Sequence, residues 1–268
     1  MKTLKTIIAI SLILGGVAVA AEKVMIDGST TVLPIAQACA ERFMEKNTNI
    51  NITVRGGGSG VGIASLIDSS CTIADSSRPI KESEIKKAIK KGVDPKANVV
   101  SMDGIAIIVH PANPVKALTK KQVKDIYTGS ISDWSQLGGT PGKIVALSRD
   151  TSSGTYEAFA ALALGGSNPR ADALLQASNQ AIATTVSKTP QGIGYIGIGY
   201  ITESVKAIPI DGVDCTKATV LSGKYPYARP LFMYTNGKPQ GNAKLFIDFV
   251  LSEEGQKIVE EQGFVPLK

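Results

Sequence analysis

An α/β fold with two lobes is predicted by the sequence, from its repeating pattern and its size. Short runs of apolar and β-branched residues alternate with segments whose apolar residues recur at helical spacing, and this alternation occurs twice along the chain. Such a rhythm is typical of a mainly parallel sheet with helices on both faces. With 268 residues, 43% of them hydrophobic, the chain can form one large domain or two smaller lobes, each with a core.

The extreme N-terminus does not follow this pattern and has the features of a cleaved secretory signal. Lys2 and Lys5 precede an apolar block at 7–20, which ends in the small residues Ala-Val-Ala. The block has fourteen residues, fewer than the ~20 that span a bilayer as a helix. The alternative is a buried core helix. No cysteine lies near the end of the block, so we expect residues 1–21 to be removed and the mature protein to be soluble, periplasmic and without a lipid anchor.

The first α/β unit follows this segment. Apolar and β-branched runs predict strands, the last of them stopped by Pro111, and helical spacing predicts helices, the last ending at Gly92. The predicted strands are 23–26, 51–54, 71–75 and 104–111, and the predicted helices are 32–47, 61–68 and 82–92. In chain order these elements form a continuous βαβ alternation.

A second unit repeats the pattern, and a strand and a helix remain at the end of the chain. The second unit has predicted helices at 119–129, 154–165 and 171–190, and predicted strands at 144–149 and 192–201. The tail has a strand at 228–236 and a long amphipathic helix at 242–263. The simplest packing returns the tail to the first lobe, so the chain crosses between lobes twice. We therefore expect lobe 1 to comprise residues 22–108 plus 229–268, and lobe 2 residues 109–228.

Charge and composition argue against nucleic acid as a partner. The formal net charge is +6, and loss of residues 1–21 would remove two lysines and no acids, leaving +4. Lysines cluster at 81–91 and 116–124, but acidic or apolar residues are interleaved, as on solvated helix faces. Aromatic residues make up 5% of the chain and do not alternate with basic residues, as base stacking would require.

Three cysteines, Cys39, Cys71 and Cys215, occur in a chain that we expect to be exported. An oxidising compartment permits a disulfide, and an odd count leaves at least one thiol unpaired. Cys39 lies on the first predicted helix and Cys71 begins a nearby strand, so we favour a Cys39–Cys71 disulfide, with buried free thiols as the alternative. No Cys-x-x-Cys spacing supports a metal or redox centre, and we expect neither a metal nor a cofactor.

Four loops that follow predicted strands share an unusual composition. Segments 27–31, 55–60, 76–78 and 150–155 are rich in hydroxyls and glycines, and each leads into a predicted helix. Ligands of open α/β sheets bind beyond the carboxyl ends of the strands. A helix N-terminus offers unpaired N–H groups, and glycine lets an anion approach the backbone, so these loops predict an oxyanion site. The alternative is that their hydroxyl side chains only cap helices; these residues are Ser29, Thr31, Ser59, Ser77 and Ser153.

Motifs for nucleotide binding and catalysis are incomplete. The stretch 138–144 fails as a P-loop, because Leu137 stands at the first glycine position and Ile144 at the Ser/Thr position. The glycine run departs from G-x-G-x-x-G at Ile63. His110 is the one histidine and is interpreted as structural, and no nucleophile elbow surrounds the serine of the fourth loop. Nucleotide binding and hydrolysis of phosphate esters are therefore unsupported.

Five longer stretches carry a specific family resemblance. They are DGSTTVLPIA, GGGSGVGI, RDTSSGTYEAF, QGIGYIGIGYI and YPYARPLFMYTN. In this order they resemble the phosphate-binding proteins of high-affinity phosphate ABC importers, over essentially the whole mature chain, and the R-x-x-x-S-G-T element at 149–155 is the most diagnostic. The resemblance implies a type II periplasmic-binding-protein fold, with inorganic phosphate clamped between two lobes at a two-strand hinge. It further implies a non-enzymatic protein whose partners are membrane permease subunits, and we expect a monomer.

The resemblance also implies roles for individual residues. Donors to phosphate would come from loops of both lobes, and Arg149 would supply the charged contact. The implied phosphate-binding residues are Ser29, Thr30, Thr31 through its amide, Ser59, Ser77, Arg149, Ser153, Gly154 and Thr155. Arg55 is not part of the matched set and is interpreted as a charge at the rim.

One position departs from the family pattern. Relatives often carry an aspartate in the third loop that accepts the proton of hydrogen phosphate and rejects sulfate, and Ser77 stands there in this chain. Rejection of sulfate is therefore less secure. We expect Asp75 to point elsewhere, yet a backbone carbonyl, Asp75 or Glu157 could each accept the proton. Three alternative functions stay open: a receptor for sulfate, molybdate or tungstate, a secreted phosphatase with Ser153 or Thr155 as nucleophile, and a secreted adhesin that reuses the fold.

Overall fold

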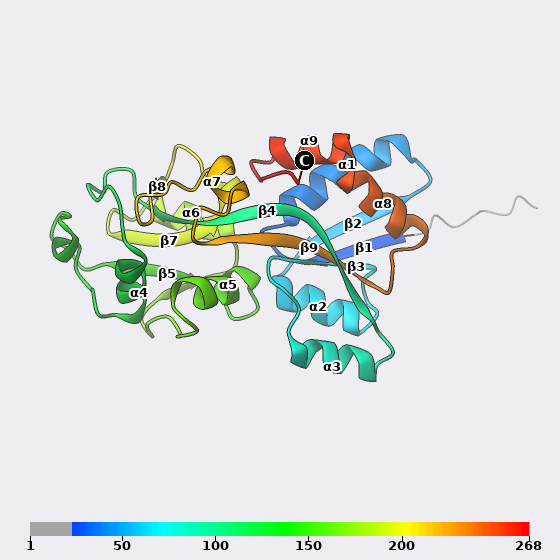
Figure 1. Ribbon diagram of the computed structural model, residues 1–268, viewed down its shortest axis with the longest axis horizontal. Coiled ribbons are helices and arrows are strands. Elements are labelled where there is room, and N and C mark those ends of the chain that lie inside the picture. Colours follow the sequence, from blue (N-terminus) through cyan, green and yellow to red (C-terminus); the bar gives the residue numbers. More distant parts are fainter. Residues whose placement is uncertain (1–22, 268) are drawn as a thin grey trace, which may run out of the picture.

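The computed structural model describes residues 23–267, so the predicted signal segment at 1–21 lies outside the described residues. The described chain forms a nine-stranded sheet with strand order β2-β1-β3-β9-β4-β7-β5-β6, and β8 pairs with β4 beside this path. Helices flank the sheet, and β4 and β9 run between its two halves (Figure 1). Within residues 23–267, no helix is both long enough and apolar enough to cross a membrane.

The first half is built on three parallel strands. β1 (Lys23–Gly28) pairs with β2 (Asn51–Gly56) and with β3 (Ile73–Ser76). Side chains alternate between the two faces of a strand, so Val24 and Ile26 join the core beneath α1, whereas Met25 packs with the core beneath α2. On one face lie α1 (Leu33–Lys46), α8 (Gly241–Leu251) and α9 (Glu253–Glu261), and on the other lie α2 (Ser59–Ile67) and α3 (Glu82–Lys90) (Figure 1).

The second half repeats this arrangement. β5 (Val145–Arg149) pairs in parallel with β6 (Leu174–Gln176) and β7 (Gly192–Gly197), and β8 (Lys206–Ile208) pairs antiparallel with β4. Phe159 packs in the core that contains Ile107, whereas Ile182 packs in the core that contains Ile108, so helices cover both faces here too. The helical elements of this half are α4 (Lys120–Thr128), η1 (Trp134–Leu137), α5 (Gly154–Ala163), α6 (Asn179–Val186), η2 (Ile198–Tyr200) and α7 (Lys217–Leu221).

Two long antiparallel strands connect the halves. β4 (Pro95–Val109) pairs with β9 (Ala228–Asn236) from its first residue to Gly104, and from Ile105 onward it pairs with β7. β9 in turn pairs with β3 of the first half. β4 therefore belongs to both halves, and the described sheet is mixed: four pairings are parallel, and four, each involving β4 or β9, are antiparallel. The α/β class is as predicted, but the mainly parallel pairing holds only among β1, β2 and β3 and among β5, β6 and β7.

The predicted elements differ from the observed ones mainly where exposure weakens the apolar pattern. β4 begins at Pro95 and not at residue 104, because its first residues are largely exposed and lack an apolar run. The segment 171–190 contains β6 followed by α6 and not one helix. Leu174 and Leu175 suggested helical periodicity, but they are exposed on an edge strand. The short β8 and α7 were not predicted.

The predicted C-terminal helix at 242–263 is two helices that meet at Ser252. Ser252 Oγ accepts a hydrogen bond from the Gly255 amide at 3.2 Å and so caps α9. A Cβ atom on Gly255 would lie 2.1 Å from the carbonyl oxygen of Phe249, so only glycine allows the two helices to meet at this angle. Both helices keep one buried face, which is why their joint hydrophobic pattern reads as one continuous helix.

The expected Cys39–Cys71 disulfide is not formed, and Cys39, Cys71 and Cys215 are free thiols. Cys39 packs in the core beneath α1, whereas Cys71 packs in the core beneath α2, on the opposite face of the sheet. Cys39 lies on α1, and Cys71 lies just before β3, so the sheet itself stands between the two side chains. Burial raises the pKa of Cys39 and of Cys71 to about 12, so both thiols are protonated near neutral pH.

A buried carboxyl lies in the first half, at the end of β3. Asp75 is 2% exposed, and its Oδ1 atom has no hydrogen-bond partner among residues 23–267. Burial, and secondly the nearby Asp27 carboxylate, raise the pKa of Asp75 well above its usual value. The folded protein therefore keeps Asp75 protonated at pH values where the unfolded chain has lost that proton, and stability falls as pH rises across this interval.

Replacing Asp75 by asparagine should remove this loss of folding stability at higher pH. Asp75→Asn should unfold at least a few degrees above the wild type at about pH 7, and the difference should vanish near pH 4. Thermal unfolding followed by circular dichroism at a series of pH values measures the gap. The exposed Asp248→Asn serves as control. A gap that stays constant from about pH 4 to pH 7 would mean that Asp75 is ionised in the folded protein.

Candidate functional site

Seven hydroxyl side chains from the predicted loops lie together where the two halves meet. We call them the hydroxyl cluster: Ser29, Thr30, Thr31, Ser59, Ser77, Ser153 and Thr155. None is more than 9% exposed. Thr31 Oγ1 of the first half lies 2.9 Å from Thr155 Oγ1 of the second, and Ser59 Oγ lies 3.3 Å from Ser77 Oγ. The loops that end β1, β2, β3 and β5 therefore face one another, as the sequence predicted.

Some hydroxyls of the cluster also cap the helices that follow them. Ser153 Oγ accepts hydrogen bonds from the amides of Thr155 and Tyr156 at 3.2 and 3.3 Å, which caps α5. Ser29 Oγ accepts from the Thr31 amide at 3.1 Å, so this amide, which the family resemblance assigned to the ligand, is already engaged by its own loop. Because these oxygens accept amide protons, their own O–H groups are left to donate. Gly154, as the first residue of α5, has an amide without an intrahelical acceptor.

The glycines of the second and fourth loops allow backbone contact between the halves. The Gly60 amide donates to the Ser152 carbonyl at 2.9 Å. A Cβ atom on Gly58 would lie 2.7 Å from the same carbonyl oxygen, and Gly58 has a positive φ of 101° that favours glycine. A Cβ atom on Gly154 would lie 2.2 Å from Ser59 Oγ. From the sequence, these glycines were expected to let an anion approach the backbone. In the structure, they let the second and fourth loops contact each other.

Arg149 is a buried cation at the end of β5. Its side chain is 1% exposed; Nε donates to the Gln176 carbonyl at 2.9 Å, and Nη2 donates to the Ala177 carbonyl at 2.9 Å and to Thr30 Oγ1 at 3.2 Å. Nη1 has no hydrogen-bond partner in the described chain. Burial lowers the pKa of Arg149, with Asp150 opposing this effect, yet a guanidinium remains charged near neutral pH. A buried cation with a free donor beside hydroxyl donors favours an anion.

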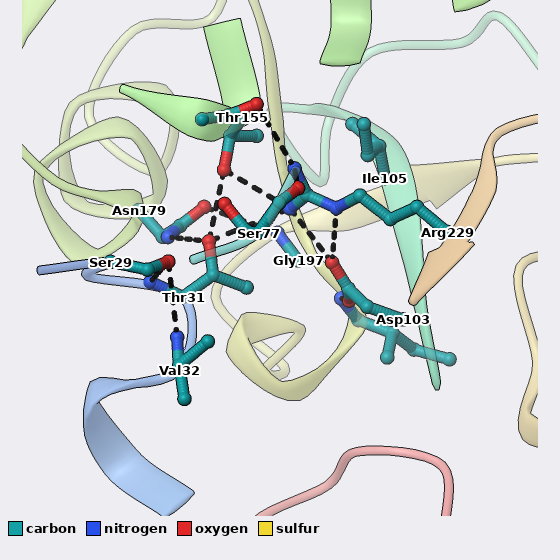
Figure 2. Close-up of polar contacts among 12 residues, drawn as sticks. Ser29, Thr31, Val32, Ser77, Asp103, Ile105, Thr155, Asn179, Gly197 and Arg229 are labelled. Atoms are coloured by element: carbon teal, nitrogen blue, oxygen red, sulfur yellow. Dashed lines mark hydrogen bonds and ion pairs between the residues drawn. The ribbon is translucent and has the colours of Figure 1, made fainter. Parts of the chain in front are cut away.

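Arg229 is a second guanidinium in the cluster, and sequence reasoning missed it. Figure 2 shows it between Asp103 and the threonine hydroxyls. Nε donates to Asp103 Oδ2 at 2.9 Å, Nη2 donates to Thr155 Oγ1 at 3.0 Å, and Nη1 donates to the Ser77 carbonyl at 2.9 Å. Asp103 is fully buried and Arg229 is 4% exposed. The available signal was a charged residue inside an otherwise apolar predicted strand.

Asn179, the first residue of α6, was also missed. Its Nδ2 donates to Thr31 Oγ1 at 2.9 Å, and its Oδ1 accepts from the Gly197 amide at 3.2 Å (Figure 2). Asn179 is fully buried. The sequence prediction placed it in the interior of one long helix at 171–190, where nothing distinguishes one polar residue from another. Asn179 faces the cluster because α6 begins at this residue.

Comparison with known proteins identifies the family. The profile described as "PBP superfamily domain" matches residues 16–254. Phosphate-binding protein PstS of Bacillus subtilis is 37% identical over 247 residues, which is 90% of this chain and 80% of that protein. PstS of Borreliella burgdorferi is 35% identical over 257 residues, covering 91% of this chain and 90% of that protein.

The chain belongs to the PstS family of phosphate-binding proteins, within the PBP superfamily. A solved structure, a putative phosphate ABC transporter substrate-binding protein with bound phosphate from Clostridium perfringens, is similar with a TM-score of 0.86 and 36% identity. It covers 92% of this chain and all of the other. The fold class predicted from the sequence is thereby confirmed.

Three further residues that the sequence analysis considered lie around the cluster: Arg55, Asp75 and Glu157. Arg55 is exposed and forms a bidentate pair with Asp27 at 2.7 and 2.8 Å, away from the hydroxyl cluster. No hydrogen bond joins the Asp75 side chain to the cluster in the described residues. Glu157 pairs across the halves with Arg78 and with Lys81. Among residues 23–267, no group of three or more His, Cys, Asp or Glu side chains could hold a metal ion.

The Asp103–Arg229 pair makes a testable contribution to stability. Arg229→Gln leaves the Asp103 carboxylate buried without its partner, which should cost about 3–5 kcal/mol and lower the unfolding temperature by roughly 10 °C. The double variant Asp103→Asn/Arg229→Gln removes both charges and should recover most of that loss. Differential scanning calorimetry measures both, with the exposed Arg42→Gln as control. Equal unfolding temperatures for the single and double variants would contradict a buried ion pair.

Proposed function

We propose that this protein is the substrate-binding component of an ABC phosphate importer, which holds inorganic phosphate between its two halves and delivers it to a membrane permease. The observation that carries the proposal is the free Nη1 donor of buried Arg149 beside a cluster of hydroxyl donors contributed by both halves. Its relatives are named phosphate-binding proteins, and the similar Clostridium perfringens protein was solved with phosphate bound.

The donor set suits a small, compact anion. Hydroxyls of the cluster, the first amide of α5 and one guanidinium converge, and a hydrogen bond to a charged group contributes about 1.5–3 kcal/mol. Micromolar affinity requires about 8 kcal/mol net. Several such bonds can supply this after the costs of dehydrating the anion and of bringing the halves together. Asp103 forms a buried pair with Arg229 at 2.8 Å, whereas Asp150 is 39% exposed and lies 3.9 Å from Arg149. Arg149 therefore supplies most of the positive charge that balances the ligand.

Phosphate must enter by separating hydroxyls that now contact each other across the two halves. The Thr31–Thr155 contact, for example, must open so that both O–H groups can point at phosphate oxygens. We infer that the halves move as two lobes about the β4–β9 connection. The change of partner strand on β4, from β9 to β7, supports a lobe boundary near Gly104, slightly before the residue 108 that we expected from the sequence. Such a hinge motion is the usual way in which two-lobed binding proteins close on a ligand.

An ion-pair group at the edge of the cluster would hold the closed form; we call Arg78, Lys81 and Glu157 the latch. Glu157 Oε2, in the first turn of α5, lies 2.8 Å from Arg78 Nε and 2.9 Å from Lys81 Nζ of the first half. Arg78 also forms a bidentate pair with Glu84 of its own half: Nη2 donates to Oε1 at 2.7 Å and Nη1 donates to Oε2 at 2.8 Å. The side chains of Arg78 and Glu157 are 5% and 18% exposed, so this pair is screened by solvent far less than a surface pair.

The geometry also supports binding without turnover. A serine or threonine nucleophile needs a general base within hydrogen-bond reach. Within residues 23–267, Ser153 Oγ hydrogen-bonds only to backbone amides, and Thr155 Oγ1 contacts Thr31 and Arg229, which cannot accept its proton as a base would. We further propose that residues 1–21 are removed on export, that the mature protein works as a monomer in the periplasm, and that its partners are permease subunits.

Phosphate titration tests the ligand and the pocket together. The wild type should bind phosphate with micromolar or tighter affinity, and Arg149→Ala should weaken binding about 100-fold or more, because the buried charge and its free donor are lost. Isothermal titration calorimetry measures both, and Arg42→Ala should bind like the wild type. Heat with sulfate, molybdate or tungstate but not with phosphate would refute the ligand while keeping the class of protein. Unchanged affinity of Arg149→Ala would refute the pocket.

The latch predicts a kinetic effect. Glu157→Gln removes the negative charge between Arg78 and Lys81, so the closed form should open sooner, and release of radiolabelled phosphate should accelerate about tenfold. The association rate should change little. Glu254→Gln, which disrupts a pair with Lys46 inside the first half, is the matched control. Release rates that are equal in Glu157→Gln and the control would show that the latch does not hold the halves together.

A further inference from the structure

We propose that the Ser77 hydroxyl accepts the proton of bound hydrogen phosphate, and that, because a hydroxyl can reverse its role, the same site also admits fully deprotonated sulfate. The proposal rests on the function proposed above. Hydrogen phosphate carries a P–OH group, which needs an acceptor inside the site, whereas sulfate carries none. The question is therefore which acceptor the hydroxyl cluster offers.

The carboxylates around the hydroxyl cluster are already paired or lie at its exposed edge in the described chain. Asp150 Oδ1 accepts from the Ser152 amide at 2.9 Å, and Asp150 Oδ2 lies 3.9 Å from Arg149 Nη2 on a side chain that is 39% exposed. Asp103 accepts from Arg229 through Oδ2 and from the Ile198 amide through Oδ1, at 3.0 Å for the latter. Glu157 is engaged in the latch by Arg78 and Lys81. In the described chain the Asp75 side chain makes no hydrogen bond to the cluster, and only its backbone carbonyl accepts one, from the Ser29 amide at 2.9 Å.

The neighbouring carbonyls already accept hydrogen bonds from strong donors. Arg149 donates to the carbonyls of Gln176 and Ala177, and Arg229 donates to that of Ser77. The Thr30 carbonyl accepts from the Tyr200 hydroxyl. Of the acceptors named on sequence grounds, Glu157 and the neighbouring carbonyls are thus engaged, and the Asp75 side chain makes no hydrogen bond to the cluster in the described chain. The hydroxyl oxygens remain.

Six of the seven hydroxyl oxygens accept a hydrogen bond from an N–H group. Each of these hydroxyls is therefore oriented to donate its own proton. Ser29 and Ser153 accept from backbone amides. Ser59 Oγ accepts from the Ser77 amide at 3.0 Å. The three threonines accept from the side chains of Arg149, Asn179 and Arg229; these are Thr30, Thr31 and Thr155. A hydroxyl that accepts an N–H bond turns its own proton elsewhere, so each of these presents O–H to the ligand.

Ser77 is the exception. In the described chain no N–H group donates to its Oγ, and its one hydroxyl contact is Ser59 Oγ at 3.3 Å. If the Ser77 O–H donates to Ser59 Oγ, the lone pairs of Ser77 are free to accept the P–OH proton. The position lies against the N-terminus of α5, because a Cβ atom on Gly154 would be 2.8 Å from Ser77 Oγ. Rotation of the hydroxyl turns the acceptor into a donor, which a carboxylate cannot do, so sulfate is not repelled.

Monofluorophosphate isolates the proposed hydrogen bond, because it keeps three phosphate oxygens and replaces P–OH by P–F. By calorimetry, the wild type should bind phosphate about tenfold or more tightly than monofluorophosphate, and Ser77→Ala should reduce this preference to about threefold or less. Thr155→Val removes a fixed donor and should weaken both ligands while keeping the wild-type preference. An unchanged preference in Ser77→Ala overturns the proposal.

Sulfate tests the reversible role. The wild type should bind sulfate within about 100-fold of phosphate, and Ser77→Asp should keep phosphate within about tenfold while weakening sulfate about 100-fold or more. Ser59→Asp, the same change at a fixed donor, should weaken both anions alike, and thermal unfolding confirms that each variant is folded. Equal losses of both anions in Ser77→Asp, or undetectable sulfate binding by the wild type, overturns the proposal. A wild type that binds no phosphate refutes the proposed function itself.

Discussion

The buried ion pair between Asp103 and Arg229 is the interaction on which the site depends. The two residues stand opposite each other in the β4–β9 ladder, on the two strands that connect the halves. Burying two charges is expensive unless their remaining donors and acceptors are satisfied, and here the Ser77 carbonyl, the Thr155 hydroxyl and the Ile198 amide do so. The pair therefore fixes the orientation of a threonine hydroxyl and a loop carbonyl from a position that is itself set by backbone pairing.

Orientation of hydroxyls is the common theme of the site. A hydroxyl can donate or accept, and a cluster of free hydroxyls would satisfy itself and bind an anion weakly. In this protein amides, a carboxamide and two guanidinium groups donate into the cluster and set the direction of its protons. The helix caps at Ser29 and Ser153 contribute in the same way, so the capping interpretation and the binding interpretation of these serines describe one arrangement. Preorganised donors of this kind bind an anion without having to reorganise first.

The sequence was sufficient for the α/β class, for most elements and for the convergence of the four loops, because these follow from periodicity and from the rule that parallel strands end at one edge. It could not show that Asn179 contacts the cluster, because that depends on where α6 begins. It could not show that Arg229 pairs with Asp103 either, because that depends on the register of β4 and β9. It misjudged the cysteines, since closeness along a chain does not tell which face of a sheet a side chain occupies. The glycine run was correctly singled out, but its packing against Ser152 required knowledge of the other half.

The free cysteines affect how the fold responds to oxidising and reducing conditions. Cys39 and Cys71 are separated by the thickness of the sheet, and their protonated, buried thiols are poor nucleophiles. No crosslink has to form for the fold to be complete, and a mild oxidant meets no reactive thiolate at either position. The architecture of the first half is thus indifferent to the redox state of the medium, and it needs no disulfide to stay folded.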